Sequence, residues 1–233
     1  APLVESGLAR YDVSRKRAAR LASTFRNCFK KEVLLESIST ALRDELNEGD
    51  ARTALSWLSS PAGQEFTRAE IASSDISLAD EYAKFRETAK DLPAGRRAIA
   101  ISLEQVLDNS ELVIQNQAML AASIELAAAS ARGDAATRPP REIESEVSEL
   151  MRRKREGIVE NRVDFYLFTY RSISDEKLRL YLDHMRSDVV QRYERAVYRA
   201  LVVATRQCHE GFRAKVLDIF PPPPPQNIQR SGR

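Results

Sequence analysis

The sequence predicts an all-α protein, and three observations lead to this prediction. Aromatic residues make up 7% of the 233 positions and only eight are glycine, whereas a β protein needs aromatic strands and many turns. Apolar residues recur at helical spacing through most of the chain. Finally, a helix break is followed at once by a helix start at Ser60-Pro61, and a weaker copy lies later in the chain. We therefore expect a multi-helix bundle.

The first expected elements surround this break. Residues 10–46 contain neither Gly nor Pro and predict a long basic helix. Asn47 caps the next helix, which carries Trp57 and stops at Ser60. Ser60 in turn is a good N-cap, and Pro61 occupies a first-turn position where the missing N–H has no intrahelical partner.

Further helices follow this bend. An apolar stripe predicts a helix over residues 78–92, and after Pro93 a long helix is expected to run to the stop at Gly133. The aromatic cluster over residues 165–170 is assigned to a helix, because an isolated strand would have no partner. Ser174 starts another helix, and the last one ends at the five prolines of residues 221–225.

The two breaks suggest a duplication. Ser60 and Ser187 are separated by 127 positions (187 minus 60), and at this offset Asn47 pairs with Ser174 and Phe66 with Tyr193. Caps match caps and apolar residues match apolar residues. We therefore predict two helix–break–helix halves, 1–136 and 137–220, packed as one domain, followed by a proline-rich tail, 221–233.

Composition limits the cell compartment and the partners. A net charge of +2 does not imply nucleic acid, and the most apolar window, residues 112–131, is interrupted by polar side chains, so no transmembrane segment is expected. Cys28 and Cys208 are either two buried thiols or one disulfide between the first and last long helices. The chain begins without Met, which favours a removed export signal and hence the disulfide.

The break also carries a family resemblance. Trp57, Ser60, Pro61, Gly63 and Phe66 resemble the Ser-Pro-x-Gly motif of a bacterial family of exported helical proteins, the domain of unknown function twenty-fifty-nine. The second copy departs from this motif, because it has Asp188 and Val190 in place of Pro and Gly. The resemblance implies an all-α fold and a periplasmic or secreted location, and it brings no activity and no catalytic residue.

No motif for catalysis, cofactor or metal is present. The two histidines, His184 and His209, lack the spacing of metal ligands, and no phosphate loop or nucleophile elbow occurs. The leading hypothesis is a non-enzymatic binding protein with an apolar groove beside the bend, for an envelope protein or an apolar ligand. Its expected binding residues are Trp57, Ser60, Pro61, Gly63, Phe66, Thr67, Glu70, Tyr166 and Tyr170.

Two alternatives stay open. A hydrolase or metal-dependent enzyme would use Glu70, which shares a helix face with Thr67, and would need a second acid in the same pocket. A nucleic-acid-binding protein would need the basic clusters Arg15–Arg20 and Arg152–Arg155 on one surface.

Overall fold

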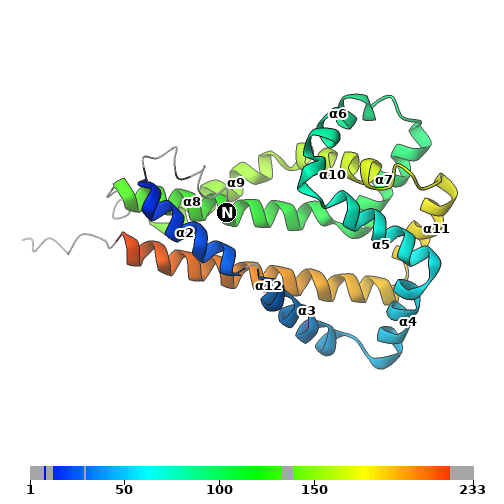
Figure 1. Ribbon diagram of the computed structural model, residues 1–233, viewed down its shortest axis with the longest axis horizontal. Helices are drawn as coiled ribbons and strands as arrows, with labels where there is room; N and C mark the ends of the chain where they lie inside the picture. The colour runs from blue at the N-terminus through cyan, green and yellow to red at the C-terminus, as the bar shows by residue number, and fades with distance from the viewer. Residues whose placement is uncertain (1–7, 9–12, 29, 133–138, 221–233) are drawn as a thin grey trace, which may run out of the picture. The chain divides into compact units, whose positions relative to one another are not determined.

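Every regular element of the described chain is helical. The computed structural model describes residues 8, 13–28, 30–132 and 139–220, which form eleven α-helices and one 3₁₀ helix with no strand (Figure 1). The prediction of an all-α helical bundle is therefore confirmed. The predicted tail, residues 221–233, lies outside the described residues.

The helices follow one another with short connections. Their bounds are α2 Arg15–Cys28, α3 Lys31–Glu45, α4 Glu48–Ser59, α5 Pro61–Ser73, the 3₁₀ helix η1 Ile76–Leu78, α6 Ala79–Ala89, α7 Ala94–Leu107, α8 Asn109–Arg132, α9 Pro140–Arg153, α10 Arg155–Thr169, α11 Asp175–Met185 and α12 Asp188–Ile219.

The chain forms two compact units that interleave along the sequence. Unit 1 comprises residues 1–33, 117–150 and 204–233, and unit 2 comprises residues 34–116 and 151–203. The four boundaries between the units fall inside helices, namely α3, α8, α9 and α12. The two consecutive halves expected from the sequence, 1–136 and 137–220 packed as one domain, stay a prediction.

Two helices expected to be continuous are interrupted. The segment expected as one helix over residues 10–46 contains α2 and α3, which are separated around Lys30 after residues of low helix propensity. The long helix expected from Pro93 to Gly133 is broken at Asp108, whose φ of 46° is left-handed. Asp tolerates this conformation, and the Glu104 carboxylate then accepts a hydrogen bond from the Ser110 N–H (2.9 Å) at the start of α8.

The bend at Ser60 forms as predicted. Its Oγ accepts a hydrogen bond from the Gly63 N–H (3.0 Å) and donates one to the Trp57 carbonyl (2.7 Å), so this residue ends α4 and caps α5. A Cβ added to Gly63 would lie 2.0 Å from the Trp57 carbonyl oxygen. Glycine is therefore required here by the close approach of the two helices.

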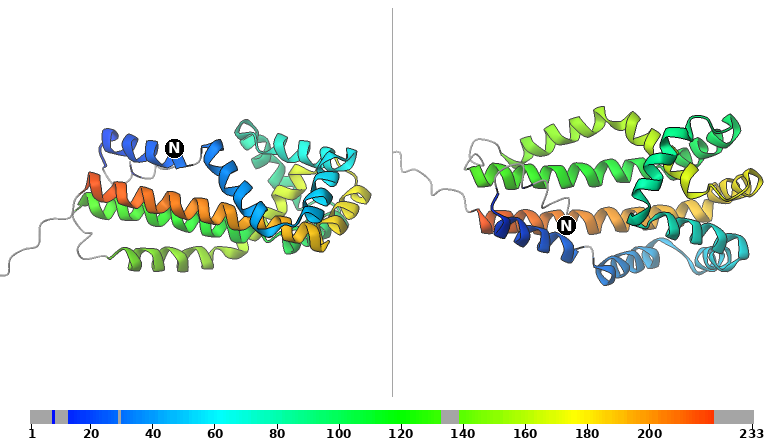
Figure 2. Two further views of the ribbon diagram at one scale, coloured as in Figure 1. Left: turned by 90° about the horizontal axis from the view of Figure 1, so that it is seen from below. Right: turned by 45° about the horizontal axis from the view of Figure 1, so that its top comes forward.

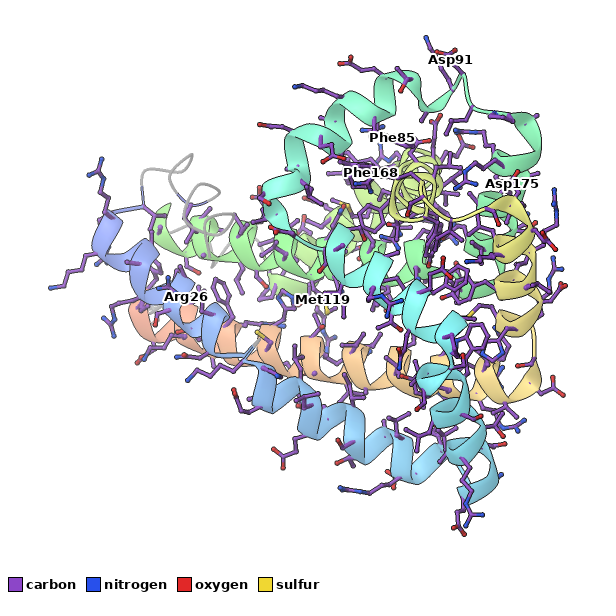
Figure 3. The ribbon with its side chains drawn as sticks, turned by 45° about the vertical axis from the view of Figure 1, so that its right-hand side comes forward. Arg26, Phe85, Asp91, Met119, Phe168 and Asp175 are labelled. Atoms are coloured by element: carbon purple, nitrogen blue, oxygen red, sulfur yellow. The ribbon has the colours of Figure 1, made fainter. Side chains whose placement is uncertain are left out.

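The core of unit 2 gathers around α10. This helix packs against α5, α6 and α7, and α11 packs against α7. The rings of Phe85 on α6 and Phe168 on α10 meet edge to face with centroids 5.4 Å apart (Figure 3). Buried Asp164 binds Arg97 (3.0 Å) and Arg86 (3.5 Å), so its charge is compensated.

In unit 1, the parts of α8 and α12 that belong to it run side by side (Figure 2). Ala127, Ala128 and Ala129 are fully buried there, as is Phe212 of α12. Such small side chains let two helix backbones approach closely. Cys208 is buried as well, but the side chain of Cys28 lies outside the described residues, so the disulfide stays a prediction.

One described helix meets the criteria for a membrane span. Over Asn109–Ala131, α8 is long and apolar enough to cross a bilayer, which the sequence analysis did not expect. The difference arises because Gln115, Asn116 and Gln117 are polar but uncharged, so the mean hydropathy of the segment stays high. Core helices of water-soluble proteins meet the same criteria, so the observation assigns no location.

Helix starts repeat at the predicted offset. Glu48 begins α4 and Asp175 begins α11, while Pro61 begins α5 and Asp188 begins α12, so each pair is 127 positions apart (175 minus 48, 188 minus 61). Beyond these starts the two halves differ. Helix α12 is 32 residues long and α5 only 13, and Phe66 is buried whereas its counterpart Tyr193 is half-buried. The structure therefore shows two helix breaks but not a duplicated domain.

Candidate functional site

A row of aromatic rings crosses unit 2 beside the bend. The ring of Phe66 stacks on Tyr181 (centroids 4.0 Å apart) and meets Tyr170 edge to face (5.5 Å), and the Trp57 ring stacks on His184 (3.8 Å). Phe66, Tyr170 and Tyr181 are all buried, so they belong to the core. The groove expected from the sequence is therefore partly filled by the aromatic residues that were expected to line it.

Glu70 on α5 lies at the edge of this row. One carboxylate oxygen, Oε1, accepts hydrogen bonds from the hydroxyls of Tyr170 (2.7 Å) and Tyr181 (2.9 Å). Burial first, and then the nearby negative charge of Glu70, raise the pKa of the Tyr181 hydroxyl well above its usual value. Both hydroxyls therefore remain donors, and they hold the carboxylate in place from α10 and α11.

A second carboxylate faces the same space. Glu194 comes from α12 and is half-buried. Burial and the charge of Glu70 raise its pKa to about 7, because ionisation would place two negative charges close together in a site with little water. Among the described residues, no cation forms an ion pair with Glu70 or Glu194.

Three cavities of unit 2 meet at Glu194. The first, about 250 Å³, lies beside Trp57 and His184 at the bend. The second, about 280 Å³, extends past Tyr170 to Arg162, and both of these cavities are also lined by Glu70 and Tyr181. The third, about 330 Å³, lies between the start of α8 and α12. Glu194 thus lines all three cavities, and Glu70 lines two of them.

The structure gathers most of the expected binding residues but divides them between cavities. Trp57, Gly63, Phe66, Thr67 and Glu70 line the cavity at the bend. Tyr166 and Tyr170 line the neighbouring one, together with Glu70. Ser60 reaches only a shallow hollow beside Trp57, and Pro61 is exposed on the first turn of α5. Ser60 and Pro61 set the bend between α4 and α5.

Sequence reasoning missed four residues of this site: Arg162, Tyr181, Tyr193 and Glu194. The only available signal was the 127-residue offset, which pairs Tyr193 with Phe66. His184 was noted only as a histidine without the spacing of a metal ligand. It stacks on Trp57, burial lowers its pKa, and its Nε2 is buried without a hydrogen-bond partner.

Contacts across the two breaks are reciprocal. Trp57 and His184, which stack on each other, are counterparts at the offset of 127 (184 minus 57). Two guanidinium nitrogens of Arg192, Nη2 and Nε, donate to the two carboxylate oxygens of Asp50 (2.6 and 2.8 Å). The Lys177 ammonium forms an ion pair with the Glu65 carboxylate (2.8 Å). Lys177 is the counterpart of Asp50 and Arg192 that of Glu65, so each half contributes the same two positions to the contact.

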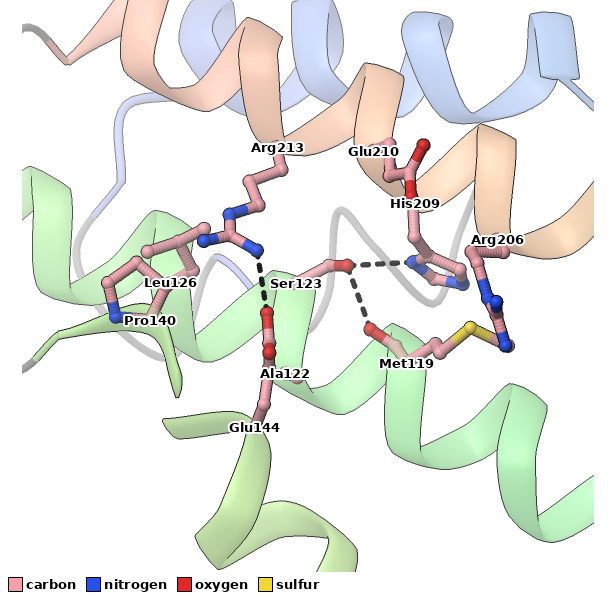
Figure 4. Close-up of a pocket in the computed structure, with 10 residues that line it drawn as sticks. All are labelled: Met119, Ala122, Ser123, Leu126, Pro140, Glu144, Arg206, His209, Glu210 and Arg213. Carbon is pink, nitrogen blue, oxygen red and sulfur yellow. Dashed lines mark hydrogen bonds and ion pairs between the residues drawn. The ribbon is translucent and has the colours of Figure 1, made fainter. Parts of the chain in front are cut away.

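Unit 1 contains a separate cavity of about 270 Å³ (Figure 4). Ser123 and His209 meet there, with Oγ and Nδ1 2.7 Å apart, and the Ser123 hydroxyl lies 2.8 Å from the Met119 carbonyl. Burial lowers the pKa of His209 to about 4, so the imidazole is neutral at pH 7. The Arg213 guanidinium binds Glu144 on the other side of the cavity (2.7 Å). Ser123 and His209 therefore form a buried hydrogen bond between two helices, and the Ser123 hydroxyl is not an exposed nucleophile.

Other predicted chemistry gains no support from the geometry. Within the described residues, no group of three or more His, Cys, Asp or Glu side chains could hold a metal ion. The basic clusters Arg15–Arg20 and Arg152–Arg155 fall in different units, and Arg155 binds Glu111 and Asp108. Binding of nucleic acid by both clusters stays an untested prediction.

Comparison with known proteins adds no assignment. No protein-family model, no curated protein and no solved structure matches this chain. The resemblance to the exported helical family therefore remains a hypothesis that depends on the five motif residues alone.

Proposed function

We propose that this chain is a binding protein whose unit 2 takes a small ligand with a positively charged amine, held between Glu70 and Glu194. The observation that carries this proposal is the convergence of two carboxylates on one aromatic-lined space, with no paired cation among the described residues. The apolar part of the ligand would lie against Trp57 and Tyr193. The apolar groove expected from the sequence thus becomes a mixed site.

The electrostatics favour a cation. Placing a second negative charge beside Glu70 is unfavourable, so Glu194 is only partly ionised near neutral pH. A bound ammonium group would stabilise both carboxylates and could also interact with the face of an aromatic ring. Binding should therefore release a proton from Glu194, which an uncharged ligand would not cause.

The origin of the site supports this view. We propose that the two helix–break–helix segments arose by duplication, since their starts, their caps and their reciprocal contacts coincide at one offset. Glu70 and Glu194 then come from the two equivalent second helices. Export to the periplasm, with Cys28 bonded to Cys208, also belongs to this proposal; the sequence supports it, and no cysteine among the described residues is free.

Trp57 provides a direct assay, because it is the only tryptophan and lines the cavity. Hexylamine and 1-hexanol, which differ mainly in charge, would be titrated while the fluorescence of Trp57 is recorded. We expect hexylamine to bind at least about tenfold more tightly, corresponding to about 1.4 kcal/mol. Glu194→Gln and Glu70→Gln should each remove this preference.

Glu87→Gln is the matched control, since Glu87 is an exposed acid of α6 that lines none of these cavities. It should bind hexylamine like the wild type. Equal affinity for the amine and the alcohol would contradict the proposal and favour a purely apolar ligand.

A second candidate function is hydrolysis by general acid and base. It is favoured by one observation: the pKa of Glu194 is about 7 beside Glu70, whose carboxylate is held by two hydroxyls. Glu194 would then donate a proton and Glu70 accept one. A panel of nitrophenyl esters and glycosides would test this candidate. A hydrolysis rate unchanged by Glu194→Gln would exclude it for those substrates.

A further inference from the structure

The cavity that holds the carboxylate pair has a positive end. Arg162 of α10 lines the same space of about 280 Å³ as Glu70 and Glu194. Its guanidinium carbon lies 5.0 Å from the ring centroids of both Phe165 and Tyr166, which hold it against the helix. Opposite charges therefore line one cavity.

Arg162 has no carboxylate partner among the described residues, and its polar contact is with the Tyr166 hydroxyl. Its Nε is buried and makes no hydrogen bond. An unsatisfied buried donor is costly, and guanidinium groups bind carboxylates and phosphates through paired hydrogen bonds. An anionic group of a ligand would supply the missing acceptor.

Each charged end of the cavity affects the pKa of a different tyrosine. Burial raises the pKa of Tyr166, and the charge of Arg162 partly offsets this rise. Burial and Glu70 raise the pKa of Tyr181 at the other end. Arg162 on α10 and Tyr170, which directly follows α10 and donates to Glu70, are eight positions apart (170 minus 162), so their backbones are separated by roughly 12 Å along the helix axis.

We propose that the ligand is a zwitterion, namely a short peptide with a free amino group at Glu70 and Glu194 and a free carboxylate at Arg162. A span of roughly 12 Å corresponds to about three extended residues. Ser73, Asn109 and Thr169 also line this cavity. The Thr169 hydroxyl donates to Ser73 (3.1 Å) and the Asn109 amide donates to the Tyr166 hydroxyl (2.9 Å), so the peptide would use the remaining hydrogen-bonding capacity of these side chains. This inference rests on the proposed function, since the amine is placed at the same carboxylates.

The test uses the full chain and three matched peptides: trialanine, its N-acetyl form and its C-terminal amide. Affinities would be measured by calorimetry and by the fluorescence of Trp57. Trialanine should bind at least about tenfold more tightly than either blocked form. Arg162→Gln should abolish the difference between trialanine and its amide, whereas Arg179→Gln, at an exposed arginine of α11, should leave it unchanged.

The outcomes separate the two proposals. If trialanine and its amide bind equally well while the acetylated form does not, the amine site stands and the anionic end is refuted. If hexylamine and all three peptides fail to bind, the proposed function itself is refuted. A circular dichroism spectrum of Arg162→Gln that matches the wild type would show that the loss of discrimination does not come from misfolding.

Discussion

Gly63→Ala tests the structural origin of the bend. The added Cβ would lie 2.0 Å from the Trp57 carbonyl oxygen and 2.8 Å from its carbonyl carbon, whereas ordinary contact begins at 3.4 Å. The missing 1.4 Å (3.4 minus 2.0) cannot be supplied by a rotamer change, because the opposing atoms belong to the backbone. The ends of α4 and α5 must therefore separate.

The cost has two sources. Separation breaks the hydrogen bond from the Gly63 N–H to the Ser60 Oγ, and loss of such a cap costs about 1 kcal/mol. Displacement of Phe66 against Tyr181 adds a packing cost of about 2 kcal/mol. We expect the free energy of unfolding to fall by about 3 kcal/mol in total, which for a chain of this size lowers Tm by roughly 6–12 °C.

Thermal unfolding followed by circular dichroism measures this shift, with Gly157→Ala as the control. Nothing lies within 4 Å of a Cβ at Gly157, which is exposed in α10, so alanine there should stabilise the protein by about 1 kcal/mol. If Gly63→Ala melted within about 2 °C of the wild type, the close approach at the bend would not exist.

Four further predictions follow from the same contacts. Ser60→Ala should lower the free energy of unfolding by about 1–2 kcal/mol in thermal unfolding, because the cap of α5 and the hydrogen bond to the Trp57 carbonyl are both lost. Tyr181→Phe should lower the free energy of unfolding by about 2 kcal/mol in the same assay, because the Glu70 carboxylate loses one of the two hydroxyl donors that hold it. Because the pKa of Glu194 is raised in the folded state, its contribution to stability is fully present below pH 4.5 and is lost as the pH rises to about 7. The free energy of unfolding, measured by chemical denaturation, should therefore fall by at most about 3 kcal/mol over this range, and Glu194→Gln should remove this fall. The lowered pKa of His209 acts with the opposite sign: its contribution is present above pH 6.5 and lost as the pH falls to about 4, so His209→Gln should be less sensitive to acid in the same assay.

The sequence predicted the local structure best where backbone chemistry decides it. Asn47, Ser60 and Ser174 are N-caps in the structure, because their side chains accept from N–H groups that have no intrahelical partner. The break at Asp108 was missed because it depends on a residue with a left-handed backbone conformation. It also depends on the Glu104 side chain, which accepts from the N–H of Ser110 six positions later. Neither feature changes the apolar spacing.

The site was harder to predict because its chemistry is assembled from separate helices. Glu70 was singled out for its place beside the motif, but Glu194 lies 124 positions later (194 minus 70) on a helix rich in charged residues. Nothing local distinguishes it from solvated acids such as Glu210. Burial beside the aromatic row and the nearby charge of Glu70 make its carboxyl hard to ionise. Proximity over such a sequence distance is not encoded in the spacing of residues.

The bend nevertheless positions the candidate site. Gly63, Phe66 and Glu70 are separated by three and four positions, so they share one face of α5 and all line the cavity at the bend. The close approach that requires glycine at the first of these positions fixes the direction in which the helix leaves Ser60. That direction carries the carboxylate of Glu70, two turns later, to the hydroxyls of Tyr170 and Tyr181. A change at the bend that moves the Glu70 carboxylate should therefore also alter the protonation of Glu194, because the pKa of Glu194 responds to the Glu70 charge.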